Sequence, residues 1–116
     1  MSVIWLCCAK MTRVSPAMTM LSWANGHFTK DSLEKMMEPA IRVAKEKNLP
    51  LFCGEFGVYP NYISNDIRLQ WYRDMCEIFH RSNIAYCHWC YKGDFPIVDA
   101  NRKPDRPLVS ILTGKK

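Results

Sequence analysis

Residues 50–57, Pro-Leu-Phe-Cys-Gly-Glu-Phe-Gly, determine the predicted fold of this chain. A short apolar run of this kind is typical of a strand in a parallel sheet, which is covered on both faces and shows no clean alternation of polar and apolar residues. Glu55 follows the run where the strand should end. A carboxylate in that position is either a hydrogen-bonded structural group or a reactive one, and the residues alone leave both interpretations open.

A helix is predicted before this strand, because apolar residues recur at helical intervals from residue 33 to residue 44. Thr29 or Asp31 is expected to cap its start. Pro39 lies inside the pattern, so we expect a kink or a helix start near it. Residues 3–9 form an earlier apolar segment that we interpret as a strand.

A second helix is expected after the strand, capped by Asn65 or Asp66. Its predicted inner face comprises Leu69, Tyr72, Met75, Cys76 and Phe79, and its predicted outer face comprises Arg68, Arg73, Asp74 and Glu77. Residues 84–91 are rich in aromatic side chains and predict another strand, and Pro107 opens a short final helix. Alternating strands and helices predict an α/β fold with parallel strands.

Composition narrows the function classes. The 116 residues are 48% hydrophobic and 23% charged, which is ordinary for one globular domain. The net charge of +5 comes from basic residues scattered among acidic ones, so we expect a solvated surface and no nucleic-acid partner. The apolar runs are far shorter than the roughly 20 residues of a membrane span. Residues 3–9 lack a preceding positive segment and a clean cleavage site, so no signal peptide is predicted.

Six cysteines are present, and three of them, Cys53, Cys76 and Cys87, fall inside apolar elements where buried free thiols are expected. Residues 87–90, Cys-His-Trp-Cys, have the spacing of a zinc site. On a strand, however, residues 87 and 90 point to opposite faces, so zinc would require a bulge or break at Trp89. The weak candidates for metal ligands are His27, His80, Cys87, His88 and Cys90.

Several of these segments together resemble glycoside hydrolase family 5, the cellulases and endoglucanases. Residues 54–57 (Gly-Glu-Phe-Gly) are similar to the seventh-strand motif of that family. Residues 23–26 (Trp-Ala-Asn-Gly), 28–33 (Phe-Thr-Lys-Asp-Ser-Leu) and 85–89 (Ala-Tyr-Cys-His-Trp) extend the resemblance over about residues 23–115. It implies part of a TIM-type (β/α) barrel, whose full length is roughly 250 residues or more. We therefore expect a divergent segment at residues 1–22 and a C-terminal half-barrel at residues 23–116.

The resemblance also implies site residues. Glu55 matches the catalytic nucleophile of a retaining mechanism. Trp89 matches the eighth-strand tryptophan that lies under the sugar beside the cleaved bond, and an indole face suits the apolar face of a glucose ring; the alternative is a core tryptophan. From their loops, Tyr59, Tyr91, Lys92 and Asp94 are candidates for contact with substrate, although loop tyrosines are often simply packed.

Part of the family's machinery is absent. Retaining glycosidases use two carboxyl groups about 5 to 5.5 Å apart, and the family takes its acid/base from an Asn-Glu-Pro motif that this chain lacks. The most similar segment is Met37-Glu38-Pro39, which lies in a predicted helix and has methionine in place of the asparagine. A histidine and a tyrosine of the sixth strand are not found in residues 1–22 either. A second carboxyl group would have to come from Asp94, Asp99 or Glu55 of a second copy, or a metal-bound water would have to take its place.

Two classes of function follow. The first is an endo-β-1,4-glucanase-like glycosidase that works on β-glucan as a homodimer or higher oligomer, because a half-barrel has open sheet edges to cover. The alternative is a non-catalytic carbohydrate-binding or vestigial half-barrel. The resemblance implies no cofactor, with zinc as the weaker option. The scattered charges and short apolar runs predict no nucleic-acid or membrane partner, and the substrate class implies an extracellular or secreted protein.

Overall fold

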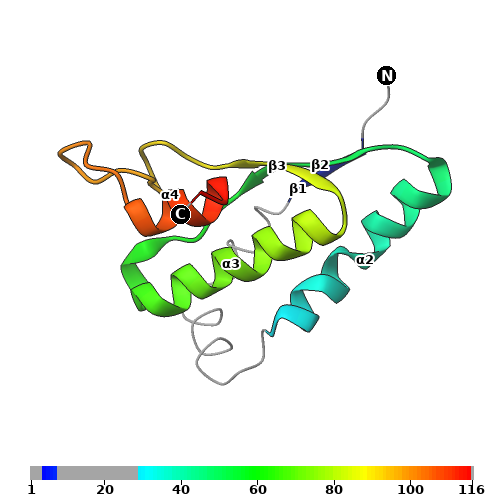
Figure 1. Ribbon diagram of the computed structural model, residues 1–116, viewed down its shortest axis with the longest axis horizontal. Helices are drawn as coiled ribbons and strands as arrows, with labels where there is room; N and C mark the ends of the chain where they lie inside the picture. Colours follow the sequence, from blue (N-terminus) through cyan, green and yellow to red (C-terminus); the bar gives the residue numbers. More distant parts are fainter. Residues whose placement is uncertain (1–3, 8–28, 116) are drawn as a thin grey trace.

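The computed structural model describes residues 4–7 and 29–115, and it shows a three-stranded parallel sheet with helices packed against it (Figure 1). The strands are β1 (Ile4–Cys7), β2 (Leu51–Phe56) and β3 (Ile84–His88), in the spatial order β1-β2-β3. The helices are α2 (Lys30–Lys47), the 3₁₀ turn Pro60–Tyr62, α3 (Asn65–Arg81) and α4 (Arg106–Thr113). The predicted α/β class with parallel strands is confirmed. The predicted boundary between residues 22 and 23 lies outside the described residues.

Helix α2 begins where its sequence predicts. Thr29 is the N-cap, and its side-chain oxygen accepts a hydrogen bond of 3.3 Å from the backbone N–H of Ser32. The helix ends at Asn48, which adopts a left-handed conformation with φ of 51°. Pro39 lies inside the helix, so the alternative of a helix start near Pro39 is wrong.

Helix α3 differs from its prediction at two points. Its N-cap is Ser64, and the expected caps Asn65 and Asp66 are its first two helical residues. Arg68, predicted to face outward, is only 6% exposed. Its guanidinium pairs with the carboxylate of Asp105, so the buried charge has a partner of opposite sign.

The core lies between one face of the sheet and the helices. Phe56 at the end of β2 is buried, and its ring makes edge-on contacts with Phe79 of α3 and Tyr86 of β3, at centroid separations of 5.0 and 5.4 Å. Leu33 of α2 and Leu108 of α4 are fully buried in the same cluster. The three helices therefore share one apolar layer with the sheet.

The opposite face of the sheet is less covered. Ala85 and Cys87 of β3 are exposed, and Phe52 of β2 is half-buried. In the described residues, β2 is thus buried on one face only, and the expected burial on both faces is not found. Cys87, predicted to be a buried thiol, is exposed because it lies on this open face, whereas Cys53 and Cys76 are buried as predicted.

Strand β3 is shorter than predicted. It ends at His88 instead of Tyr91, and the peptide bond between Trp89 and Cys90 is cis. The chain then forms an irregular loop up to α4, whose N-cap Asp105 accepts a hydrogen bond from the backbone N–H of Leu108. Among the helices of the described residues, none has the length and apolar character needed to cross a membrane.

Candidate active site

Glu55 and Trp89 lie at the same edge of the sheet, where the parallel strands β2 and β3 end. Glu55 is the next-to-last residue of β2, and Trp89 follows the last residue of β3. The backbone N–H of Trp89 donates a hydrogen bond of 3.0 Å to the carbonyl oxygen of Phe56. The Glu55 side chain is exposed. In α/β barrels this carboxyl edge is where catalytic residues gather.

The chain passes unusually close to Trp89 at Gly57. A β-carbon built on Gly57 would lie 2.5 Å from the carbonyl oxygen of Trp89 and 2.9 Å from the β-carbon of Phe95. Real β-carbons do not approach a carbonyl oxygen so closely, so this position requires glycine. The glycine of the strand motif thus lets the loop after β2 lie against the segment that carries Trp89.

Trp89 is exposed and not a core residue. Its exposed fraction is 49%, whereas Trp71 on α3 is 3% exposed and packs its ring against Tyr72. The core interpretation of Trp89 is therefore not supported, because about half of this residue is accessible at the carboxyl edge. Tyr91 is also exposed, on the loop after β3.

Tyr59 is packed against a neighbouring loop and is also exposed, and its predicted contact with substrate stays a prediction. Its ring packs against Phe95 with centroids 6.4 Å apart, which joins the loop after β2 to the loop after β3. Its hydroxyl oxygen accepts a hydrogen bond of 3.0 Å from the side-chain amide of Asn61. The side chain nevertheless remains exposed, so it is available to a ligand at this edge.

The two aspartates considered as a second carboxyl group have different surroundings. One carboxylate oxygen of Asp99 accepts hydrogen bonds from the backbone N–H groups of Asn101 and Lys103, at 2.9 and 2.8 Å. Asp99 thus stabilises a turn of the loop. Asp94 and its neighbour Lys92 are exposed on the segment that follows Trp89.

A partly buried contact between a tyrosine and a histidine lies beneath this edge. The hydroxyl of Tyr72 on α3 is 3.1 Å from Nε2 of His88, the last residue of β3, and it accepts a hydrogen bond of 3.0 Å from the backbone N–H of Val58. Burial lowers the pKa of His88 to about 4, with the nearby Arg68 charge acting in the same direction, so the imidazole is neutral at pH 7. Burial also raises the pKa of Tyr72 to about 12.

The sequence alone predicts other surroundings for these two residues. It places Tyr72 in the apolar core and makes His88 a weak candidate for a metal ligand. The only signal for the pair was chemical: a tyrosine in a buried helix face needs a hydrogen-bond partner for its hydroxyl.

The weak metal candidates are not brought together. His88 engages Tyr72, Cys90 lies in the loop after β3, and His80 is on α3. Within residues 4–7 and 29–115, no group of three or more histidine, cysteine, aspartate or glutamate side chains is placed to hold a metal ion. His27 lies outside the described residues.

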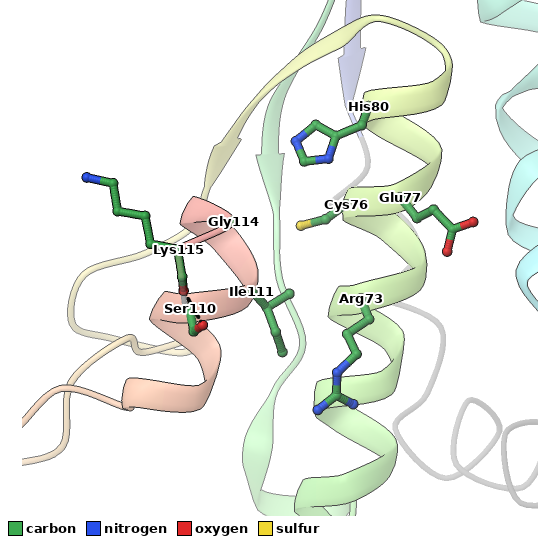
Figure 2. A pocket seen from close by; sticks show the side chains of 8 residues that line it. All are labelled: Arg73, Cys76, Glu77, His80, Ser110, Ile111, Gly114 and Lys115. Atoms are coloured by element: carbon green, nitrogen blue, oxygen red, sulfur yellow. Dashed lines mark hydrogen bonds between the residues drawn. The ribbon is translucent and has the colours of Figure 1, made fainter.

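A shallow pocket of about 420 Å³ lies on the helical side of the molecule, between α3 and α4 (Figure 2). Its lining residues are Arg73, Cys76, Glu77, His80, Ser110, Ile111, Gly114 and Lys115. These side chains come from the covering helices and the residue pair after α4. Because barrel active sites lie at the carboxyl ends of the strands, we do not place the candidate active site in this pocket.

Comparison with known proteins gives a sequence match to an endoglucanase. No protein-family model matches the chain. Over 99 residues it is 34% identical to Endoglucanase C of Acetivibrio thermocellus, a match that covers 84% of this chain and 29% of that relative. The chain therefore spans about three tenths of the length of this relative.

Solved structures agree in fold. A hyperthermophilic endo-β-1,4-glucanase in complex with substrate superposes with a TM-score of 0.67 at 23% identity, over 74% of this chain and 28% of that one. Cel5A of Thermotoga maritima in complex with cellobiose superposes with a TM-score of 0.65 at 17% identity, over 72% of this chain and 27% of that one. The α/β fragment thus matches part of a TIM-barrel endoglucanase, and the matched share is smaller than a half-barrel. In sequence and fold, the chain is a partial match to endoglucanase C and to the Cel5A-type endoglucanases of glycoside hydrolase family 5, over about a quarter to a third of their chains.

Proposed function

We propose that this chain supplies the nucleophile and the sugar platform for cleavage of β-1,4-glucan, with Glu55 in the first role and Trp89 in the second. The observation that carries the proposal is their placement: an exposed carboxylate and an exposed indole lie at the carboxyl ends of adjacent parallel strands. The partial match to proteins named endoglucanases supports the same chemistry.

In the proposed reaction, the Glu55 carboxylate attacks the anomeric carbon of a glucose unit held against Trp89. The bond to the leaving sugar breaks as a second carboxyl group protonates its glycosidic oxygen. Water then hydrolyses the glycosyl–enzyme ester, and the second group takes the proton from that water. Tyr59 and Tyr91 extend the apolar surface for neighbouring sugars, and Lys92 and Asp94 reach their hydroxyls.

The second carboxyl group is the missing part. Asp99 is engaged in its own turn, which leaves Asp94 or a residue supplied by another chain. Within the described residues β1 and β3 are the two edges of the sheet, and one face carries exposed side chains. We propose that a second copy covers these edges and completes the site as a homodimer. Size-exclusion chromatography with light scattering tests this, and a stable monomer that cleaves glucan contradicts it.

The central experiment measures release of reducing sugar from carboxymethylcellulose by the wild type and Glu55→Gln. Gln keeps the size of the side chain and removes the nucleophile, so activity should fall at least about a thousandfold. Glu38→Gln is the matched control, because Glu38 is an exposed glutamate on α2, in the helical layer. Equal activity in the wild type and Glu55→Gln would remove Glu55 from the mechanism.

A non-catalytic glucan-binding module is the second candidate, favoured by the exposed aromatic side chains together with the absence of the Asn-Glu-Pro motif from the sequence. It predicts that the wild type and Glu55→Gln bind cello-oligosaccharides equally and release no sugar.

We propose that the hydrolysis of glucan needs no metal, so a chelator should leave the activity unchanged. Activity lost on chelation would instead point to zinc near Cys87 and Cys90. An insoluble polysaccharide substrate would place the protein outside the cell.

A further inference from the structure

Three polar groups from three different segments converge under the candidate site. The backbone N–H of Val58 comes from the loop after β2, the hydroxyl of Tyr72 from α3, and the imidazole of His88 from the end of β3. The hydroxyl oxygen lies 3.0 Å from the Val58 nitrogen and 3.1 Å from Nε2 of His88. Tyr72 is 1% exposed, so water does not replace either partner.

The direction of each hydrogen bond follows from proton counting. The Val58 N–H can only donate, so the Tyr72 oxygen accepts from it. The single hydroxyl proton then needs an acceptor, because a buried donor without one is costly. Nε2 of a neutral His88 is such an acceptor, which places the imidazole proton on Nδ1. The low pKa of His88 and the high pKa of Tyr72 agree with this neutral arrangement.

The two hydrogen-bond partners of Tyr72 lie close in sequence to Glu55 and Trp89, the two proposed functional residues. Val58 is three positions after Glu55 and directly precedes Tyr59, and His88 directly precedes Trp89. Resting on the proposed function, we propose that Tyr72 is a positioning residue that sets the spacing between the glutamate loop and the tryptophan platform. A buried hydroxyl between two strand ends is suited to this, because its two bonds fix both ends relative to the rigid helix α3.

Tyr72→Phe removes the hydroxyl and keeps the ring, and Tyr86→Phe is its matched control. Tyr86 is half-buried, and its hydroxyl donates to the carbonyl oxygen of Leu112 in α4 and not to the site. Both variants should lose thermal stability to a similar degree. Only Tyr72→Phe should reduce glucan cleavage, by about ten- to a hundredfold and mainly in kcat, because misplacement of the reacting groups has effects of that size. Equal losses in the two variants would reduce Tyr72 to an ordinary core residue.

Substitution of His88 separates positioning from packing. His88→Gln retains an acceptor within reach of the Tyr72 hydroxyl and should keep most of the kcat. His88→Leu offers a similar apolar volume without an acceptor and should match the loss in Tyr72→Phe. If His88→Leu is as active as His88→Gln, the hydrogen bond has no positioning role.

NMR spectroscopy of the 116-residue chain gives a readout that needs no glucan. In ¹⁵N-labelled wild type at pH 7, His88 should carry its proton on Nδ1, and Tyr72→Phe should shift the Val58 amide and the Trp89 indole resonances together. Unchanged resonances in Tyr72→Phe would overturn the proposal. Coupled shifts in a protein that neither binds nor cleaves glucan would overturn the proposed glucanase function and still support positioning by Tyr72.

Discussion

The α-carbon of Gly57 lies so close to Trp89 that an added β-carbon would come within 2.5 Å of the Trp89 carbonyl oxygen. This contact joins the glutamate motif to the tryptophan segment through backbone alone. Gly57, the last glycine of the motif, therefore has a packing role. The atom nearest to an added β-carbon is a backbone oxygen, which cannot move aside as the end of a flexible side chain can.

Gly57→Ala should therefore displace the Trp89 segment and lower the free energy of unfolding by about 1–3 kcal/mol, as overpacking does. The Trp89 indole resonance reports the displacement, and urea denaturation reports the stability. Gly114→Ala is the control, since Gly114 has a φ of +65° and open space around its α-carbon. That variant should cost about 1 kcal/mol from backbone strain alone and leave Trp89 in place. An unmoved Trp89 resonance in Gly57→Ala would contradict the close approach.

Removal of the Trp89 indole should weaken glucan binding without unfolding the protein. A sugar that covers about 100 Å² of indole gains about 2 kcal/mol, so the Kd of Trp89→Ala for cellotetraose should rise about thirtyfold. Met36→Ala on α2 is the control, because Met36 is similarly exposed, at 52% against 49%, and lies in the helical layer. Calorimetric titration measures the affinities. Unfolding of Trp89→Ala, with Met36→Ala stable, would restore the core interpretation.

The pair of the buried Arg68 and the half-buried Asp105 should dominate the electrostatic stability of the fold. Asp105→Asn keeps a side chain able to cap α4 and leaves the Arg68 charge without its partner. We expect a loss of about 3 kcal/mol in the free energy of unfolding, part of which the double variant with Arg68→Leu should recover. Glu46→Gln, which breaks the exposed pair with Arg42, should cost less than about 1 kcal/mol. Strictly additive losses in the double variant would show that the two side chains are not coupled.

Stability should fall on acidification because of His88. Its pKa is lowered in the folded protein from the usual 6.5 to about 4 by burial and by Arg68. The unfolded chain therefore binds more protons between these two values, so the free energy of unfolding is greatest above pH 6.5 and decreases as the pH falls towards 4. His88→Gln should flatten this part of the profile of Tm against pH, measured by circular dichroism. A profile that is the same with and without His88 would show that this imidazole does not carry the effect.

Much of the fold could be predicted because its signals are local. The apolar run before Glu55, the helical stripe after Thr29 and the proline near the start of α4 each depend on neighbours in sequence, and all three elements formed as expected. The placement of Glu55 and Trp89 at one edge could also be anticipated, because parallel strands end on the same side.

Features that depend on distant contacts could not be predicted. Arg68 lies at the helical spacing of the buried residues Tyr72 and Met75, but its charge predicts an exposed side chain. Asp105, 37 residues later, is what makes its burial possible. The end of β3 could not be predicted for a similar reason. The residue types at 89–91 favour a strand, and only the packing of this segment against Gly57 shows that the strand ends before it.

The 3₁₀ turn Pro60–Tyr62 and helix α3 connect β2 to β3, so Glu55, Tyr72 and Trp89 all lie within residues 51–89. Recombination between barrel genes with crossovers outside residues 51–89 would transfer three residues together. These are the candidate nucleophile Glu55, the candidate sugar platform Trp89 and the positioning residue Tyr72. Their mutual spacing would be carried along, while the acid would have to come from the recipient. A library of chimeric barrels with crossovers at residues 50 and 92 should consequently retain function more often than one with a crossover inside α3.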